Sequence, residues 1–518
     1  MPAVTESPVI ETHNGRVRGR TDNGIWRFTG IPYGADTSGA NRFRRPQPVD
    51  SWSGVRDAAE FGPSAMQLGA HPDQSTRQMS EDCLVLNVWT SGAVGKRPVL
   101  FWIHGGGFFQ GSGDDPITDG SALAARGDVV VVSVNHRLGI FGFLDLESLD
   151  PDGSQGSGNA GLLDLVAALT WVRDNIASFG GDPDAVHVFG HSGGGAKVSA
   201  LMSMPQARGL FRTAGIHGGP PFGLSNPDKA TVTAAEVMSV AGAPASAAGA
   251  NALRALSSTD VLGLQSDLAG DRAPVAGAMR FTPVVGRAAL PGSPQEFFAT
   301  GGTDDIGLII GTSRDEARFA LRGGWGYESS SFALDRAELV RRVGRGLDDS
   351  ASADTLVERY HRLAPDATWA DLLFDILSDQ FRIRTVRLAA ARLSGGNSNT
   401  FGYLCELGGN QQTGAFHGVE MPLFFNTPDA ADWTDRPEAH RIAAEVSSAL
   451  VRFATTGRPD QCGELWPALT ETWDQLVIGK DAVSTRRAPL AERMSAWDGI
   501  LATPRTDPWS TLFLDAPQ

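Results

Sequence analysis

The chain contains 518 residues, with 59 Asp or Glu against 44 Lys or Arg and a formal net charge of −15. This acidic balance, without a basic run, argues against nucleic acid and anionic membrane surfaces as partners. No apolar run approaches the roughly 20 residues of a membrane span, and residues 1–19 lack the apolar core of a signal peptide. We therefore expect a cytoplasmic protein. The cysteines do not form the pattern of a disulfide framework: Cys83, Cys405 and Cys462.

Apolar segments in the first third of the chain predict an α/β architecture. Residues 8–36 are expected to form β-hairpins, and residues 84–89 and 99–103 a second pair of strands. Residues 129–134 predict another buried strand, and because these strands are continuously apolar we expect a sheet covered on both faces. Apolar residues at helical spacing over 162–176 then predict a helix that leads into the next strand, which completes a βαβ unit.

The predicted strand at 99–103 ends in the sequence His-Gly-Gly-Gly at residues 104–107. Such a loop can present bare backbone N–H groups to a carbonyl oxygen, and in acyl-transfer enzymes these groups stabilise the developing oxyanion. Gly106 and Gly107 are the candidate donors in this loop. Gly193, farther along the chain, is expected to add a third N–H group.

The most specific motif is Gly-His-Ser-Gly-Gly at residues 190–194, which fits the G-x-S-x-G nucleophile elbow of α/β-hydrolases. The apolar residues 185–189 before it predict a short buried strand, and the glycines after it can open a helix. A tight strand–turn–helix leaves no room for side chains beside the serine, which explains the flanking glycines. Ser192 is therefore the candidate nucleophile.

Later segments predict further strands and two helical insertions. Residues 230–263 are Ala-rich and helical, and residues 334–377 contain several helical stretches, so we expect both to cap a site. Residues 306–310 and 401–407 predict later strands of the sheet. Residues 439–455 predict an amphipathic helix.

A nucleophilic serine needs a base, and the base needs a carboxylate that orients it. In α/β-hydrolases the chain order is serine, acid and then histidine, with the acid after a strand end. The strand at 306–310 is followed by two adjacent carboxylates, Asp315 and Glu316. The pattern alone does not choose between them.

The base is expected in a loop after a late strand. Four histidines follow Ser192 in the sequence. His217 precedes the acid, and His361 and His440 lie in polar helical segments typical of a protein surface. Position and elimination therefore leave His417 as the candidate base.

With these motifs in place, the chain resembles the type-B carboxylesterases, the carboxylesterase/lipase family that includes the cholinesterases. The likeness covers nearly the whole length and is carried by residues 28–33, 81–88, 104–108, 135–138, 158–164, 179–183, 190–194, 313–316 and 417–420. It implies a single α/β-hydrolase domain over residues 1–518, with a large, mostly parallel mixed sheet. It also implies Glu316 rather than Asp315 as the acid, and His417 as the base. Three phenylalanines are expected to line an apolar substrate pocket: Phe108, Phe109 and Phe319.

The chain departs from the family pattern at several positions, and the loop of residues 66–80 lacks the tryptophan that cholinesterases use to stack a quaternary ammonium. His191 stands before the serine, where Glu is common, and Gly193 stands after it, where Ala is common. Gly218 occupies a place where the family often has a serine that supports the acid. Cys83 matches a half-cystine, but its usual partner position holds Ala65, so this family disulfide cannot form and a reducing compartment is favoured.

The resemblance and the motifs together predict a serine carboxylic ester hydrolase acting on small to medium apolar esters. Ser192 would attack the carbonyl, His417 would take its proton and Glu316 would orient the imidazole, with water then hydrolysing an acyl-enzyme. We expect no metal, no cofactor, and a monomer or homodimer. One alternative keeps the triad but changes the reaction to carbamate or amide hydrolysis or acyl transfer. The other is a non-catalytic, cholinesterase-like binding protein.

Overall fold

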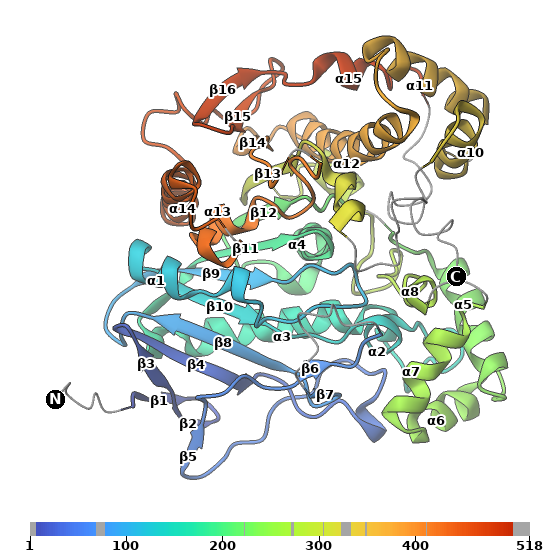
Figure 1. The fold of residues 1–518 in the computed structure, drawn as a ribbon. Helices are drawn as coiled ribbons and strands as arrows, with labels where there is room; N and C mark the ends of the chain where they lie inside the picture. Colours follow the sequence, from blue (N-terminus) through green and yellow to red (C-terminus); the bar gives the residue numbers. More distant parts are fainter. Residues whose placement is uncertain are drawn as a thin grey trace.

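The computed structural model describes residues 7–68, 78–221, 223–270, 274–303, 305–322, 333–347, 350–410, 412–431 and 433–500. Within these ranges, eleven strands form one sheet, which Figure 1 shows edge to edge from blue to red. Its strands are, in spatial order, β16 (Val483–Arg487), β15 (Asp474–Ile478), β14 (Thr400–Cys405), β13 (Gly307–Ser313), β12 (Thr213–His217), β11 (Gly181–His191), β9 (Arg97–Ile103), β10 (Val130–Val134), β8 (Val85–Thr90), β4 (Ile25–Pro32) and β3 (Arg20–Asp22).

The centre of this sheet is parallel and its edges are antiparallel. Each neighbouring pair from β10 through β15 runs parallel, whereas β16, β8, β4 and β3 pair antiparallel. The mixed, mostly parallel sheet that the sequence predicts is therefore confirmed. A smaller sheet contains β1 (Val9–Thr12), β2 (Gly15–Arg18) and β5 (Val55–Asp57), and β6 (Ser64–Ala65) pairs with β7 (Met79–Ser80).

The structure corrects one strand pairing. Residues 84–89 and 99–103 do lie in strands, β8 and β9, but the two are not neighbours. Strand β10 lies between them, antiparallel to β8 and parallel to β9. An apolar run identifies a strand, whereas its partner depends on tertiary packing, and consecutive strands are adjacent only about two-thirds of the time.

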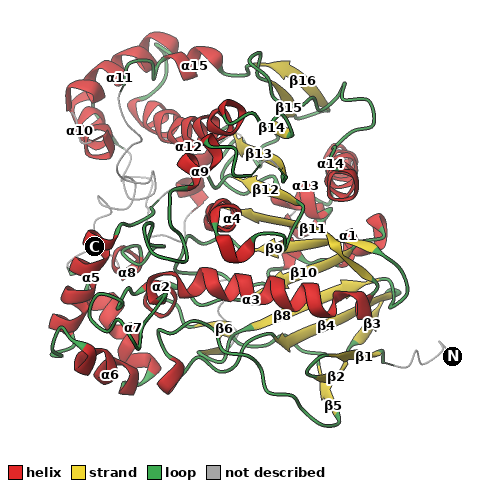
Figure 2. Cartoon of the chain, turned by 180° about the vertical axis from the view of Figure 1, so that it is seen from behind, coloured by secondary structure: helices red, strands yellow, loops and turns green. Residues whose placement is uncertain are grey.

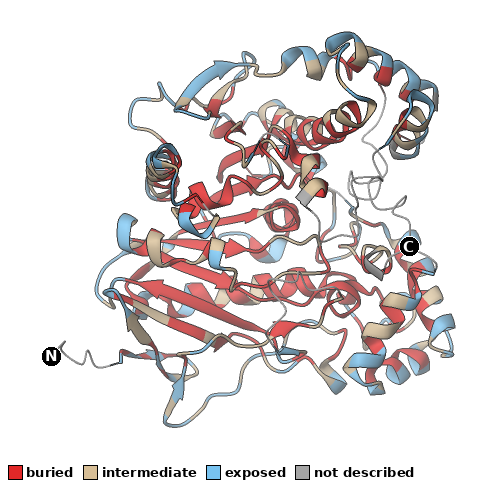
Figure 3. Ribbon diagram, viewed as in Figure 1, coloured by how far each residue is buried: buried red, intermediate tan, exposed pale blue. Residues whose placement is uncertain are grey.

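Helices cover both faces of the sheet, as the apolar strands predict. Along β9, Val99, Phe101 and Ile103 point into one buried cluster, while Leu100 and Trp102 point into another, which is the period of two expected for a strand. Figure 2 shows α3 lying along one face, and Figure 3 shows the strands as mostly buried. The first cluster includes residues of α3 (Ala160–Asn175), α4 (Gly193–Ser203) and α12 (Trp369–Ser394), and the second of α1 (Ser121–Gly127), α13 (Met421–Phe425) and α14 (Pro437–Thr456).

The predicted βαβ unit and helical insertions are also present. Helix α3 connects β10 to β11, and β9 lies between these two parallel strands. The segment after β12 carries α5 (Pro227–Val240), α6 (Ala247–Ala255), α7 (Ser258–Asp267), α8 (Pro274–Ala278) and α9 (Pro294–Ala299), while α2 (Gly139–Phe143) follows β10. The segment after β13 carries α10 (Arg336–Leu347), α11 (Ser350–Leu363) and α12, which share a separate small core with residues after α15 (Ala491–Ser495). None of the described helices combines the length and apolarity needed to cross a membrane.

Candidate active site

Ser192 occupies a sharp turn between a strand and a helix. Strand β11 ends at His191 and α4 begins at Gly193, so the serine alone makes the turn between them. Its backbone angles are φ 57° and ψ −125°, which is a strained conformation for a non-glycine residue. Its N–H donates to the carbonyl of His217 at 2.8 Å, which ties the turn to the end of β12. A Cβ on Gly194 would lie 2.2 Å from the Ile103 carbonyl oxygen. The turn is thus held so close to β9 that only glycine fits there.

The carboxylate of Glu316 contacts the imidazole of His417. Glu316 follows the end of β13, two residues beyond Arg314, and accepts the N–H of Ser313 at 2.8 Å through Oε1. Its other oxygen, Oε2, is hydrogen bonded to Nδ1 of His417. The backbone N–H of His417 also donates to the Glu316 carbonyl at 3.2 Å. Both side chains are buried. The contact joins the turn after β13 to the loop after β14, at the carboxyl edge of the sheet.

The carboxylate of Asp315 contacts other groups than the His417 ring. Its carboxylate accepts the N–H of Ala415 at 2.8 Å and pairs with the Arg314 guanidinium at 2.8 Å. Although burial opposes the charge, Arg314 lowers the pKa of this carboxyl. Of the two adjacent acids that the sequence left open, Glu316 is the one that contacts the imidazole, and Asp315 fastens the loop that carries it.

His191 fills space beside the His417 ring. The two ring centroids lie 4.3 Å apart. A Cβ on Gly218 would lie 3.1 Å from Nε2 of His191 and 3.3 Å from Oε1 of Glu316. The two departures from the family pattern are therefore coupled in space, because the imidazole of His191 crowds the position where a side chain on residue 218 would begin.

Burial dominates the electrostatics of the acid–imidazole pair. It lowers the pKa of His417, so the ring is neutral at neutral pH and able to accept a proton. Burial raises the pKa of Glu316, while the N–H of Ser313 and the guanidinium of Arg382 favour its ionised form. A second buried acid, Glu420, accepts the Ser313 hydroxyl at 2.8 Å and the Tyr403 hydroxyl at 3.2 Å. The acid side of the site is thus a hydrogen-bonded network.

Hydrogen bonds fix the carbonyls of Gly105 and Gly106 in the His-Gly-Gly-Gly loop. A Cβ on Gly105 would lie 3.5 Å from Cβ of Ser192, so the loop borders the serine. The Gly105 oxygen is bonded to Nδ1 of His104 at 2.8 Å, and the Gly106 oxygen accepts the N–H of Gln110 at 3.1 Å. Because C=O and N–H point in opposite directions in a trans peptide, these bonds orient the N–H groups of Gly106 and Gly107. Within the described part of the chain, neither N–H donates to a protein acceptor.

Aromatic rings surround the imidazole of His417. The Phe319 ring centroid lies 6.1 Å from it, and that of Phe381, on α12, lies 5.5 Å from it. Phe108 packs against Phe143 at 5.4 Å in the buried core, and Phe109 lies against Gly107. The sequence did not single out Phe381, since an apolar pattern identifies a buried helix but not which of its side chains reaches the site.

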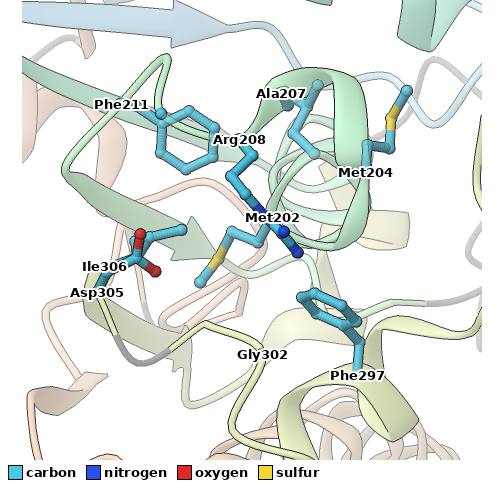
Figure 4. Close-up of a pocket in the computed structure, with 11 residues that line it drawn as sticks. Met202, Met204, Ala207, Arg208, Phe211, Phe297, Gly302, Asp305 and Ile306 are labelled. Carbon is cyan, nitrogen blue, oxygen red and sulfur yellow. The ribbon is translucent and has the colours of Figure 1, made fainter.

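The hollow drawn in Figure 4 lies elsewhere. Met202, Phe211, Phe297 and Asp305 are among its lining residues, near the end of α4 that is remote from Ser192. An 11-residue helix spans about 16 Å, which separates this hollow from the serine. Among the described residues, no group of three or more His, Cys, Asp or Glu side chains could hold a metal ion.

The chain is similar to known hydrolases over most of its length. A para-nitrobenzyl esterase of Bacillus subtilis is 33% identical over 495 residues, which cover 94% of this chain and 97% of the relative. A phenmedipham hydrolase of Pseudarthrobacter oxydans is 32% identical, over a match that covers 93% of this chain and 97% of the relative. The crystal structure of a Geobacillus stearothermophilus carboxylesterase superposes with a TM-score of 0.83 and 34% identity, over 95% of this chain and all of that one.

The α/β-hydrolase fold is thereby confirmed. The sequence model of the carboxylesterase family matches residues 6–497, which is nearly the whole chain. The chain therefore belongs to the carboxylesterase family and is a carboxylesterase.

Proposed function

We propose that the chain hydrolyses carboxylic esters through an acyl-enzyme on Ser192. His417 takes the proton of the serine hydroxyl, and Glu316 holds the imidazole and stabilises its cation. The bond between Nδ1 of His417 and the Glu316 carboxylate carries the proposal, because it leaves Nε2 as the ring nitrogen that accepts a proton. The N–H groups of Gly106, Gly107 and Gly193 bind the oxyanion.

The proposed substrates are small to medium apolar esters. Support comes from the phenylalanine rings beside His417, which favour an apolar acyl or alcohol group. The alternative of carbamate or amide hydrolysis by the same residues has a specific reason to be tested, since one relative is named a phenmedipham hydrolase. A substrate panel should therefore contain p-nitrophenyl esters of increasing acyl length, para-nitrobenzyl esters and phenmedipham.

We also propose that the enzyme works in a reducing compartment, the cytoplasm. The support is that the structure leaves Cys83, Cys405 and Cys462 as free thiols.

The test is covalent labelling combined with Ser192→Ala. A fluorophosphonate should label the wild type once, at Ser192, and the variant should not be labelled. Loss of a triad nucleophile typically lowers kcat by about a million-fold, so the folded variant should show no turnover of p-nitrophenyl butyrate above background. Labelling at another serine, or a variant with even a tenth of wild-type activity, would contradict the assignment.

A further inference from the structure

One buried charge near the site is not used by the proposed mechanism. Lys197 lies on α4, five residues after Ser192, and its side chain is fully buried. Its ammonium nitrogen donates to the carbonyl oxygen of Gly107 at 2.7 Å and lies 5.3 Å from the centre of the Phe108 ring. A fully buried lysine is uncommon, because its ammonium group loses its hydration.

The surroundings of Lys197 offer little to offset that loss. No carboxylate forms an ion pair with it in the part of the chain that the structure describes. The titratable groups that face it are His104 and His136, whose rings stack 4.7 Å apart after β9 and β10. Burial, and then the charge of Lys197, lowers the pKa of both histidines, so they remain neutral. Burial lowers the pKa of Lys197 to about 7. Its amine donates hydrogen bonds in either protonation state.

The position of the Gly107 carbonyl depends on Lys197 and on Gly193 together. A Cβ on Gly193 would lie 1.9 Å from the Gly107 oxygen, so this carbonyl occupies space that any larger residue would fill. The lysine is the donor that holds it there. Gly105 and Gly106 have their carbonyls held by other groups of the loop, and Lys197 completes the series at Gly107.

We propose that Lys197 is a positioning residue for the oxyanion hole: its amine holds the Gly107 carbonyl in the space left by Gly193, which sets the path of the loop whose N–H groups face the reacting carbonyl. The proposal rests on the proposed function, because it assigns a role within that reaction. It also gives a reason for glycine after the nucleophile, where the family commonly has alanine.

The central test is Lys197→Met, which keeps an unbranched side chain and removes the donor. Removing one oxyanion-hole donor lowers kcat by about 10²–10³-fold, so misdirecting the loop should lower kcat by roughly 10–100-fold while KM changes less than about threefold. The affinity for a trifluoromethyl ketone, which forms an oxyanion adduct with the serine, should fall by the same factor as kcat/KM. The control is Lys229→Met, an exposed lysine on α5, which should behave as wild type.

Active sites should be counted by fluorophosphonate titration, so that kcat refers to folded enzyme. A purely structural lysine would reduce the number of active sites and leave both kcat per site and ketone affinity unchanged, which would overturn the proposal. Gly193→Ala displaces the same carbonyl from the other side, and it should give a similar loss that is less than additive with Lys197→Met. A folded Gly193→Ala enzyme with wild-type kcat would also overturn it.

The same titration separates this inference from the proposed function. If the wild type is not labelled at Ser192, the proposed function fails. If the wild type is labelled and turns over while Lys197→Met matches it, the function stands and only the role of Lys197 is refuted.

Discussion

The adjacent acids Asp315 and Glu316 provide a matched test of the site, because they are neighbours in the chain but their carboxylates contact different groups. Glu316→Gln keeps the shape of the side chain that meets His417 but removes its charge. Asp315→Asn does the same to the neighbouring acid, which contacts Arg314 and Ala415 instead. We predict that the first change abolishes most turnover and the second does not.

The magnitudes follow from these contacts. Neutralising a triad carboxylate lowers kcat by about 10⁴-fold, equivalent to roughly 5.4 kcal/mol at 1.36 kcal/mol per tenfold. The amide that Glu316→Gln introduces cannot stabilise an imidazolium, and Glu316 is fully buried, so water cannot replace its charge. In the pair of Arg314 and Asp315 the carboxylate is buried but the guanidinium is partly exposed, and pairs that water reaches contribute about 1 kcal/mol or less. Asp315→Asn should therefore keep kcat within about threefold of wild type.

The assay is kcat/KM for p-nitrophenyl butyrate, with active sites counted by a fluorophosphonate and folding checked by circular dichroism. Asp315→Asn is the matched control, since it changes a carboxylate to an amide one residue away. Equal losses in the two variants would show that the loop, and not the charge at Glu316, limits the rate. A larger loss for Asp315→Asn would refute the assignment of the acid.

Two further predictions concern pH and stability. Because burial lowers the pKa of His417, and only the neutral ring accepts a proton, kcat/KM should rise with pH through a midpoint below about 6.5 and then stay level; a midpoint above neutrality, in a profile from pH 4 to 9, would contradict this. Asp164 accepts the backbone N–H of Arg137 at 3.0 Å and its guanidinium at 2.8 and 2.6 Å in the core, so Asp164→Asn should leave a buried charge unpaired at a cost of about 3–5 kcal/mol. At about 2.1 cal/mol/K per residue, that cost lowers Tm by roughly 3–5 °C, and calorimetry showing no decrease would contradict it.

The sequence identified the parts of the site where local geometry restricts residue type. Gly194 has no room for a Cβ beside Ile103, so the elbow is visible as a glycine pattern. The choice between Asp315 and Glu316 depends on the path of a loop about 100 residues farther on, and the residues alone could not settle it.

Pairing in the sheet and the role of Lys197 were beyond the sequence for related reasons. Strand β10 pairs with both β8 and β9 and lies between them. An apolar run predicts a strand, but it does not predict which strands pair. Every residue of helix α4 is buried. The sequence pattern of this helix therefore does not separate a buried face from an exposed one, and it does not show that Lys197 is buried. Lys197 becomes conspicuous only when the Gly107 carbonyl is seen beside it.

Ser192, Glu316 and His417 follow three different strands of one sheet, β11, β13 and β14, and this has a consequence for synthesis of the chain. The strands that carry the serine, the acid and the imidazole are separated by long insertions, and about 225 residues lie between the first and last of these side chains. At translation rates of about 5–20 residues per second, the imidazole leaves the ribosome roughly 10–45 s after the serine. Under the proposed mechanism, a growing chain would carry an unactivated serine for most of that time, and hydrolysis would begin only after β13 and β14 have joined the sheet.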